Sequence, residues 1–163
     1  MIYSRMKRNT AFTIIELIVV MIIMAILATL VVSRWPGTKI SLNAQAQQLA
    51  SDIRYTQTLA MSRGGAYRLN VTASNYSITT LSGTAVNNPI TGSATVTLGS
   101  GITITISPTN LPNNLITFNT AGVPYVDTTE TTALSSAAVI TLTSGTNTKT
   151  ITIQPTTGRV TSP

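Results

Sequence analysis

The stretch Phe12–Val32 reads FTIIELIVVMIIMAILATLVV and decides how the rest of the chain can fold. Only Thr13, Glu16 and Thr29 carry polar side chains among its 21 residues. As an α-helix it would be roughly 31 Å long, which is enough to cross the hydrocarbon core of a bilayer. We therefore predict that residues 12–35 form a membrane-spanning helix.

Basic residues at the N-terminus predict the orientation of that helix. Arg5, Lys7 and Arg8 precede the apolar stretch, and positively charged flanks stay on the cytoplasmic side of a membrane. The prediction is a single-pass membrane protein with a cytoplasmic N-terminus and its C-terminal head on the other side of the membrane. Without these three charges the formal net charge falls from +6 to +3, so composition alone is weak evidence for a nucleic-acid partner.

Two other interpretations of the apolar stretch are less consistent with the residues. A secretory signal needs a small-x-small cleavage site directly after its core, but Ser33, Arg34 and Trp35 follow here. A plain signal anchor gains nothing from Glu16, whose carboxylate costs about 2–3 kcal/mol inside an apolar helix. A cut before Phe12 would create an amino group four residues before Glu16, and staggered copies could pair the two groups.

The residues around this cut have a family resemblance. Ala11-Phe12-Thr13-Ile14-Ile15-Glu16-Leu17 resembles the processing site of type IV prepilins and type II secretion pseudopilins. The resemblance implies that prepilin peptidase removes a leader of residues 1–11 and methylates the new amino group of Phe12. It also implies that Glu16 serves filament assembly. The family usually has Gly before the cut, so Ala11 predicts slower processing.

A second helical segment is expected over residues 36–64. Pro36-Gly37 should interrupt the first helix near the membrane surface. Beyond it, one stripe recurs with the spacing 4-3-4-3-4 and consists of Leu42, Ala46, Leu49, Ile53, Thr56 and Ala60. This spacing predicts an amphipathic helix that packs on a sheet and ends at Gly64-Gly65.

After Gly65 the periodicity of apolar residues changes to two, which is typical of strands. About seven short strands are expected in the head, residues 65–163, with hairpins joining 67–71 to 76–78 and 140–142 to 151–153. Residues 82–93 and 122–136 are predicted to be surface loops. The predicted fold is α+β, a long N-terminal α-helix packed on a β-rich globular head of antiparallel strands.

Three segments of the head resemble a narrower group. Residues 51–64, 116–124 and 151–160 are similar to GspH/FimT-type minor pseudopilins and to minor pilins of the mannose-sensitive haemagglutinin pilus. The resemblance implies a minor structural subunit of a type IV pilus or a type II secretion pseudopilus. It also implies that the membrane is the bacterial inner membrane and that the head is periplasmic. Its implied partners are other pilin subunits, prepilin peptidase, the inner-membrane assembly platform and the lipid bilayer.

Catalysis and metal binding have little support in the sequence. The chain has neither Cys nor His, which removes the commonest nucleophile–base pairs and metal ligands. Asp52 is predicted to be a surface charge beside Arg54, and Asp127 and Glu130 a solvated loop pair that is too small a set for Ca²⁺. We therefore predict no enzyme activity, no cofactor and no metal.

DNA binding is the remaining alternative, because some FimT-like pilins resemble DNA receptors with a basic C-terminal patch. Here Lys149 and Arg159 are the candidate phosphate contacts. No aromatic residue is interleaved with them to stack on bases, so DNA is the weaker prediction.

Overall fold

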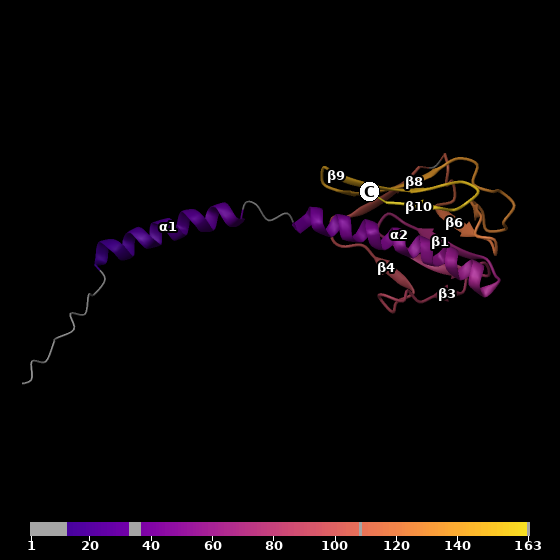
Figure 1. Ribbon diagram of the computed structural model, residues 1–163, viewed down its shortest axis with the longest axis horizontal. Coiled ribbons are helices and arrows are strands. Elements are labelled where there is room, and N and C mark those ends of the chain that lie inside the picture. The colour runs from indigo at the N-terminus through magenta and orange to yellow at the C-terminus, as the bar shows by residue number, and fades with distance from the viewer. Residues whose placement is uncertain (1–12, 33–36, 108, 163) are drawn as a thin grey trace, which may run out of the picture. The chain divides into compact units, whose positions relative to one another are not determined.

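The computed structural model describes residues 13–32, 37–107 and 109–162, and the chain divides into two compact units, 1–36 and 37–163. The first unit contains α1 (Ile14–Val32), and the second begins with α2 (Gly37–Arg63) (Figure 1). The predicted cut between Ala11 and Phe12, and Pro36 of the predicted helix interruption, lie outside the described residues. No helix of the described residues combines the length and the apolarity needed to cross a membrane.

The predicted apolar stripe is the face that α2 buries. All six of its side chains, from Leu42 to Ala60, are at most 1% exposed. Its one polar member, Thr56, satisfies its hydroxyl by donating to the carbonyl of Asp52 at 2.7 Å. The helix ends at Arg63, because Gly64 adopts the left-handed conformation (φ 64°) that commonly terminates helices.

The first sheet, sheet A, has six strands in the described residues. Its order is β3-β2-β1-β6-β7, and β4 pairs with β2. Antiparallel register of Leu69 with Ile78 confirms the predicted first hairpin. The strands are β1 (Tyr67–Val71), β2 (Asn75–Thr80), β3 (Ala85–Val86), β4 (Thr95–Thr97), β6 (Leu115–Phe118) and β7 (Pro124–Tyr125).

The second sheet, sheet B, has four described strands in the order β10-β9-β8-β5. Ile140 lies opposite Ile151, which confirms that the predicted C-terminal strands pair, while Leu142 lies opposite Lys149. The strands are β5 (Thr103–Ile106), β8 (Ala138–Ser144), β9 (Asn147–Ile153) and β10 (Val160–Thr161).

The core of the head lies where α2 meets both sheets. The helix packs on β1 and β6 of sheet A and on β8, β9 and β10 of sheet B (Figure 1). Every side chain of the buried hydrophobic cluster comes from residues 42–160, so the second unit carries its own core. The predicted α+β class is confirmed.

Two segments predicted to be surface loops contain strands. β3 lies within residues 82–93 and β7 within residues 122–136, so the prediction of uninterrupted loops was wrong there. Each strand has only two residues, which is too short for an alternating pattern to be visible. Their pairing with β2 and β6 depends on backbone hydrogen bonding that no side-chain pattern reports.

Candidate functional site

Glu16 lies in the first turn of α1. Its backbone N–H donates to the side-chain oxygen of Thr13 at 3.3 Å and to the Thr13 carbonyl at 3.1 Å. Thr13 therefore caps the helix, and the carboxylate stands at the positive end of the helix dipole. The sequence analysis missed this cap, although the spacing Thr-x-x-Glu before an apolar run is its signature.

From Leu17 to Ala28, α1 is apolar on every face. From Ile14 to Leu27 its large hydrophobic side chains are between 46% and 82% exposed. Since successive residues of a helix point about 100° apart, exposure of nearly all of them leaves no polar side for water. Such a helix is stable only in lipid or among other apolar helices.

The two basic residues proposed as DNA contacts are not brought together. Lys149 shares the inward side of β9 with Ile151 and Ile153. Arg159 precedes Val160, which pairs with Ile153, so it lies beside the other end of β9 and points to the opposite face. Five residues of strand separate the two positions, roughly 17 Å. The fold therefore forms no continuous phosphate-binding patch from them.

Asp52 was predicted to be a surface charge, and that prediction was wrong. The residue is 1% exposed, and its carboxylate accepts a hydrogen bond from the Tyr76 hydroxyl at 2.6 Å. Burial raises the pKa of Asp52, while Tyr76 and the neighbouring Asn88 act in the opposite direction. The Nδ2 atom of Asn88 is buried and has no hydrogen-bond partner of good geometry among the described residues.

Asp127 organises its own loop. Its carboxylate accepts hydrogen bonds from the N–H groups of Thr129, Thr131 and Thr132 and from the Thr131 hydroxyl, at 2.6–3.2 Å. These bonds, led by that of Thr131, hold the pKa of Asp127 well below its usual range. The carboxylate is thus committed to the loop, and the described residues contain no group of three potential metal ligands.

Gln57 joins α2 to two turns of the head, which lie in the family-like segments 116–124 and 151–160. Its Nε2 atom donates to the carbonyl of Gly122 at 2.8 Å and to that of Thr157 at 2.9 Å. The first turn follows β6 and the second precedes β10. Residues 51–64, 116–124 and 151–160 therefore meet at one side chain, which explains why the three family-like segments occur together.

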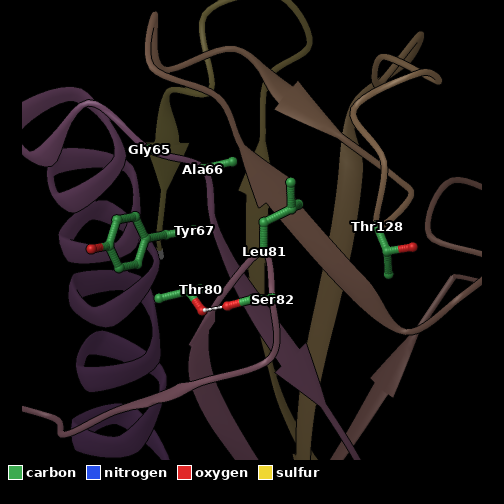
Figure 2. Close-up of a pocket in the computed structure, with 7 residues that line it drawn as sticks. All are labelled: Gly65, Ala66, Tyr67, Thr80, Leu81, Ser82 and Thr128. Atoms are coloured by element: carbon green, nitrogen blue, oxygen red, sulfur yellow. Dashed lines mark hydrogen bonds between the residues drawn. The ribbon is translucent and has the colours of Figure 1, made fainter.

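Two adjoining hollows open beside the C-terminal end of α2. The first, of about 600 Å³, lies among Gly65, Ala66, Tyr67, Leu81, Ser82 and neighbouring threonines. Figure 2 shows the Tyr67 ring projecting toward the helix and Thr128 standing on the opposite side. The second, of about 470 Å³, shares Tyr67 and Thr80 with the first and extends between α2 and β3. We call the two together the α2–β3 groove.

Comparison with known proteins agrees with this geometry. Residues 6–32 match the prokaryotic N-terminal methylation motif, and residues 45–157 match the type II transport protein GspH. The fold is similar to the type IV minor pilin FimU of Pseudomonas aeruginosa strain PAO1, with 14% identity and a TM-score of 0.57 over 77% of this chain and 90% of FimU.

A second solved structure is similar to about the same extent. It is the minor pseudopilin EpsH from the type 2 secretion system of Vibrio cholerae, with 9% identity and a TM-score of 0.53 over 76% of this chain and 96% of EpsH. At these identities both structures bear on the fold alone. No curated protein sequence matches the chain.

A methylation motif followed by a helix that packs on two antiparallel sheets defines the class of minor pilins and pseudopilins. Within that class the family match extends over more than half of the chain, from residue 45 to residue 157. The chain therefore belongs to the GspH family of type IV minor pilins and pseudopilins.

Proposed function

We propose that the chain is made as an inner-membrane precursor, loses residues 1–11 by cleavage between Ala11 and Phe12, is methylated on Phe12 and then enters a filament. The filament is a type IV pilus or a type II secretion pseudopilus. The observation that carries the proposal is α1, whose apolar side chains are exposed on all faces around one carboxylate, Glu16.

The apolar surface of α1 favours lipid before assembly and neighbouring apolar helices after it. Each large apolar side chain gains about 1.5–3 kcal/mol when it leaves water, so the helix needs lipid before assembly. Filament assembly replaces lipid with neighbouring helices, a transfer between apolar surroundings in which packing and polar contacts decide affinity. Glu16 supplies the polar contact, because a neighbour's N-terminal amine at the same depth would neutralise it.

Partners and location follow from the same scheme. Members of the family are structural subunits, and minor pilins assemble with other pilin or pseudopilin subunits. The basic leader stays in the cytoplasm, where prepilin peptidase reaches it, and the head lies in the periplasm. The inner-membrane assembly platform then extracts the processed chain. No step in this scheme requires catalysis by the chain itself.

Intact mass is the first test of processing. Expression with and without prepilin peptidase should yield, respectively, a chain that begins with singly methylated Phe12 and a chain that retains residues 1–11. A full-length chain in both preparations would overturn the processing step. An Ala11→Gly variant should be processed faster if the residue before the cut limits the rate.

Incorporation into filaments tests the role of Glu16. Glu16→Gln keeps the shape of the side chain but removes its charge, so we expect at least a tenfold loss of the chain from sheared filaments. Glu130→Gln is the matched control, because it neutralises an acidic residue in a loop of the head. Equal recovery of both variants would contradict the proposed pairing of Glu16 with an amine.

DNA binding is retained as the alternative function. Lys149 and Arg159 would act as separate phosphate contacts, since roughly 17 Å separates them along the strand direction. This alternative predicts salt-dependent binding of double-stranded DNA that the paired substitution Lys149→Gln and Arg159→Gln weakens. Unchanged binding by that double variant would eliminate these residues as the DNA site.

A further inference from the structure

The α2–β3 groove contains polar groups that the filament function does not use. They come from three elements: Tyr55 and Arg63 from α2, Tyr67 from β1, and Asn87 from the residue after β3. Among the described residues none of these four side chains has a hydrogen-bond or ion-pair partner. Four unpaired polar groups therefore converge on one hollow of about 470 Å³, within the size range of small-ligand sites.

The chemistry of these groups selects a class of ligand. Arg63 presents a guanidinium that can hold a carboxylate by two parallel hydrogen bonds. The hydroxyls of Tyr55 and Tyr67 and the amide of Asn87 can donate to and accept from ligand hydroxyls. The two tyrosine rings add apolar surface, and among the described residues no carboxylate lines the groove.

We propose that the α2–β3 groove binds an acidic saccharide, with the sugar carboxylate on Arg63 and the sugar hydroxyls on Tyr55, Tyr67 and Asn87. The inference is independent of filament incorporation, because binding is a property of the single head. A nucleic acid fits less well, since one guanidinium lines the groove and phosphate chains need several cations. The last turn of α2 adds partial negative charge nearby, so the carboxylate depends on Arg63.

The lining of the groove also predicts which end of a longer saccharide would lie away from Arg63. The first hollow, which Arg63 does not line, adds Ser82 and Thr128, and Thr128 belongs to the loop that also carries Asp127 and Glu130. The Ser82 hydroxyl lies 2.8 Å from that of Thr80, which lines both hollows. That end suits neutral hydroxylated sugar and disfavours a second carboxylate. A disaccharide with one acidic residue should therefore bind more tightly than the acidic monosaccharide, while a fully acidic disaccharide should not.

The test is a titration of the full chain in detergent with saccharide ligands, in which binding is monitored by NMR. The probes are the methyl glycosides of glucuronate, galacturonate and N-acetylneuraminate, each beside its carboxyl methyl ester, which keeps the shape and removes the charge. For ligands of this size we expect a Kd on the order of 1 mM for at least one acid. The corresponding ester should bind at least tenfold more weakly.

Variants assign the binding to the groove. Arg63→Gln should weaken the acid at least tenfold, and Tyr55→Phe should weaken it severalfold with its ring retained. Arg159→Gln is the matched control, because it removes another exposed arginine and should change nothing. Absence of binding at ten times the expected Kd, equal binding of acid and ester, or full binding by Arg63→Gln would overturn the proposal. Equally tight binding of an oligoglutamate peptide would also overturn it, because the ligand class would then be an acidic peptide.

Discussion

Gly158 is the position at which a single methyl group should do the most damage. Its backbone adopts φ 62°, a conformation that favours glycine, and it lies in the turn before β10. A Cβ atom there would lie 2.5 Å from Nε2 of Gln57, 2.8 Å from the carbonyl oxygen of Gly122 and 2.9 Å from the ring of Phe118. Gly158→Ala therefore combines backbone strain with overpacking at the junction of α2 and the two turns.

The expected loss of stability can be estimated in two parts. A non-glycine residue in the left-handed region costs roughly 1–2 kcal/mol. Overpacking adds about 1–3 kcal/mol, because Gln57 can move only by breaking hydrogen bonds, and Phe118 is fully buried. The total of roughly 2–5 kcal/mol corresponds to a fall in Tm of roughly 10–20 °C for a domain of this size.

Gly145→Ala separates the two parts. Gly145 has a similar backbone conformation, φ 58°, but a Cβ atom there would meet nothing within 4 Å. It should show the strain alone, roughly 1–2 kcal/mol, or a fall in Tm of about 4–8 °C. The assay is thermal unfolding of each full-length variant in detergent, followed by circular dichroism in the strand region.

Two results would refute the argument from packing. Equal Tm values for Gly158→Ala and Gly145→Ala would mean that the turn relaxes around the added methyl group. The double variant Gln57→Ala with Gly158→Ala tests the same point, because removing the amide leaves the contacts with Gly122 and Phe118. A double variant that is less stable than Gln57→Ala by no more than the strain of roughly 1–2 kcal/mol would show that the amide was the only steric obstacle.

Other predictions concern polar groups of the head. Gln57→Ala should lower the free energy of unfolding by about 1–3 kcal/mol in urea titrations, since it removes two hydrogen bonds; a change below that range would contradict its role in joining the turns. Because the pKa of Asp52 is raised, its protonated form stabilises the fold below pH 3.8, and this stabilisation is lost as pH rises through the folded-state pKa. Asp52→Asn should therefore be more stable than the wild type at neutral pH in urea unfolding, and the difference between the two should shrink in acid, where Asp52 is protonated. A variant less stable than the wild type at neutral pH would contradict this. Asp127 has the opposite effect on the pH dependence of stability: because its pKa is lowered, its ionised form stabilises the fold above pH 3.8, and this stabilisation is lost as pH falls through the folded-state pKa. Asp127→Asn should lower Tm by a few degrees at neutral pH and make no difference in strong acid; an equal deficit at both pH values would exclude the charge as the cause.

Repeating patterns made most of the head predictable. The apolar stripe of α2 keeps an alternating spacing of four and three residues over five intervals. The hairpins of β1 with β2 and of β8 with β9 have alternating apolar residues on both sides of turn-forming residues. In each of these patterns, several apolar residues recur at the positions that the helix or strand buries. A single deviation, such as Thr56, therefore does not conceal the element.

Single residues and long-range partners were harder to predict. Asp52 lies three residues after Leu49 and four before Thr56, so its position on the buried side of α2 was readable from spacing. Its charge suggested the surface, because the compensating partner Tyr76 lies on another element, 24 residues away. Lys149 and Arg159 were misjudged for the opposite reason: they are close in the sequence, but the fold does not place them on one surface.

The divided edge of sheet A limits how copies of the head can meet. On that edge β3 and β4 pair with successive parts of β2, and they contribute two and three residues respectively. A neighbouring chain thus finds no long row of free backbone donors and acceptors on which to extend the sheet. At this edge of sheet A, contacts with a neighbouring head would therefore be made by side chains, and these can change one residue at a time without altering the sheet.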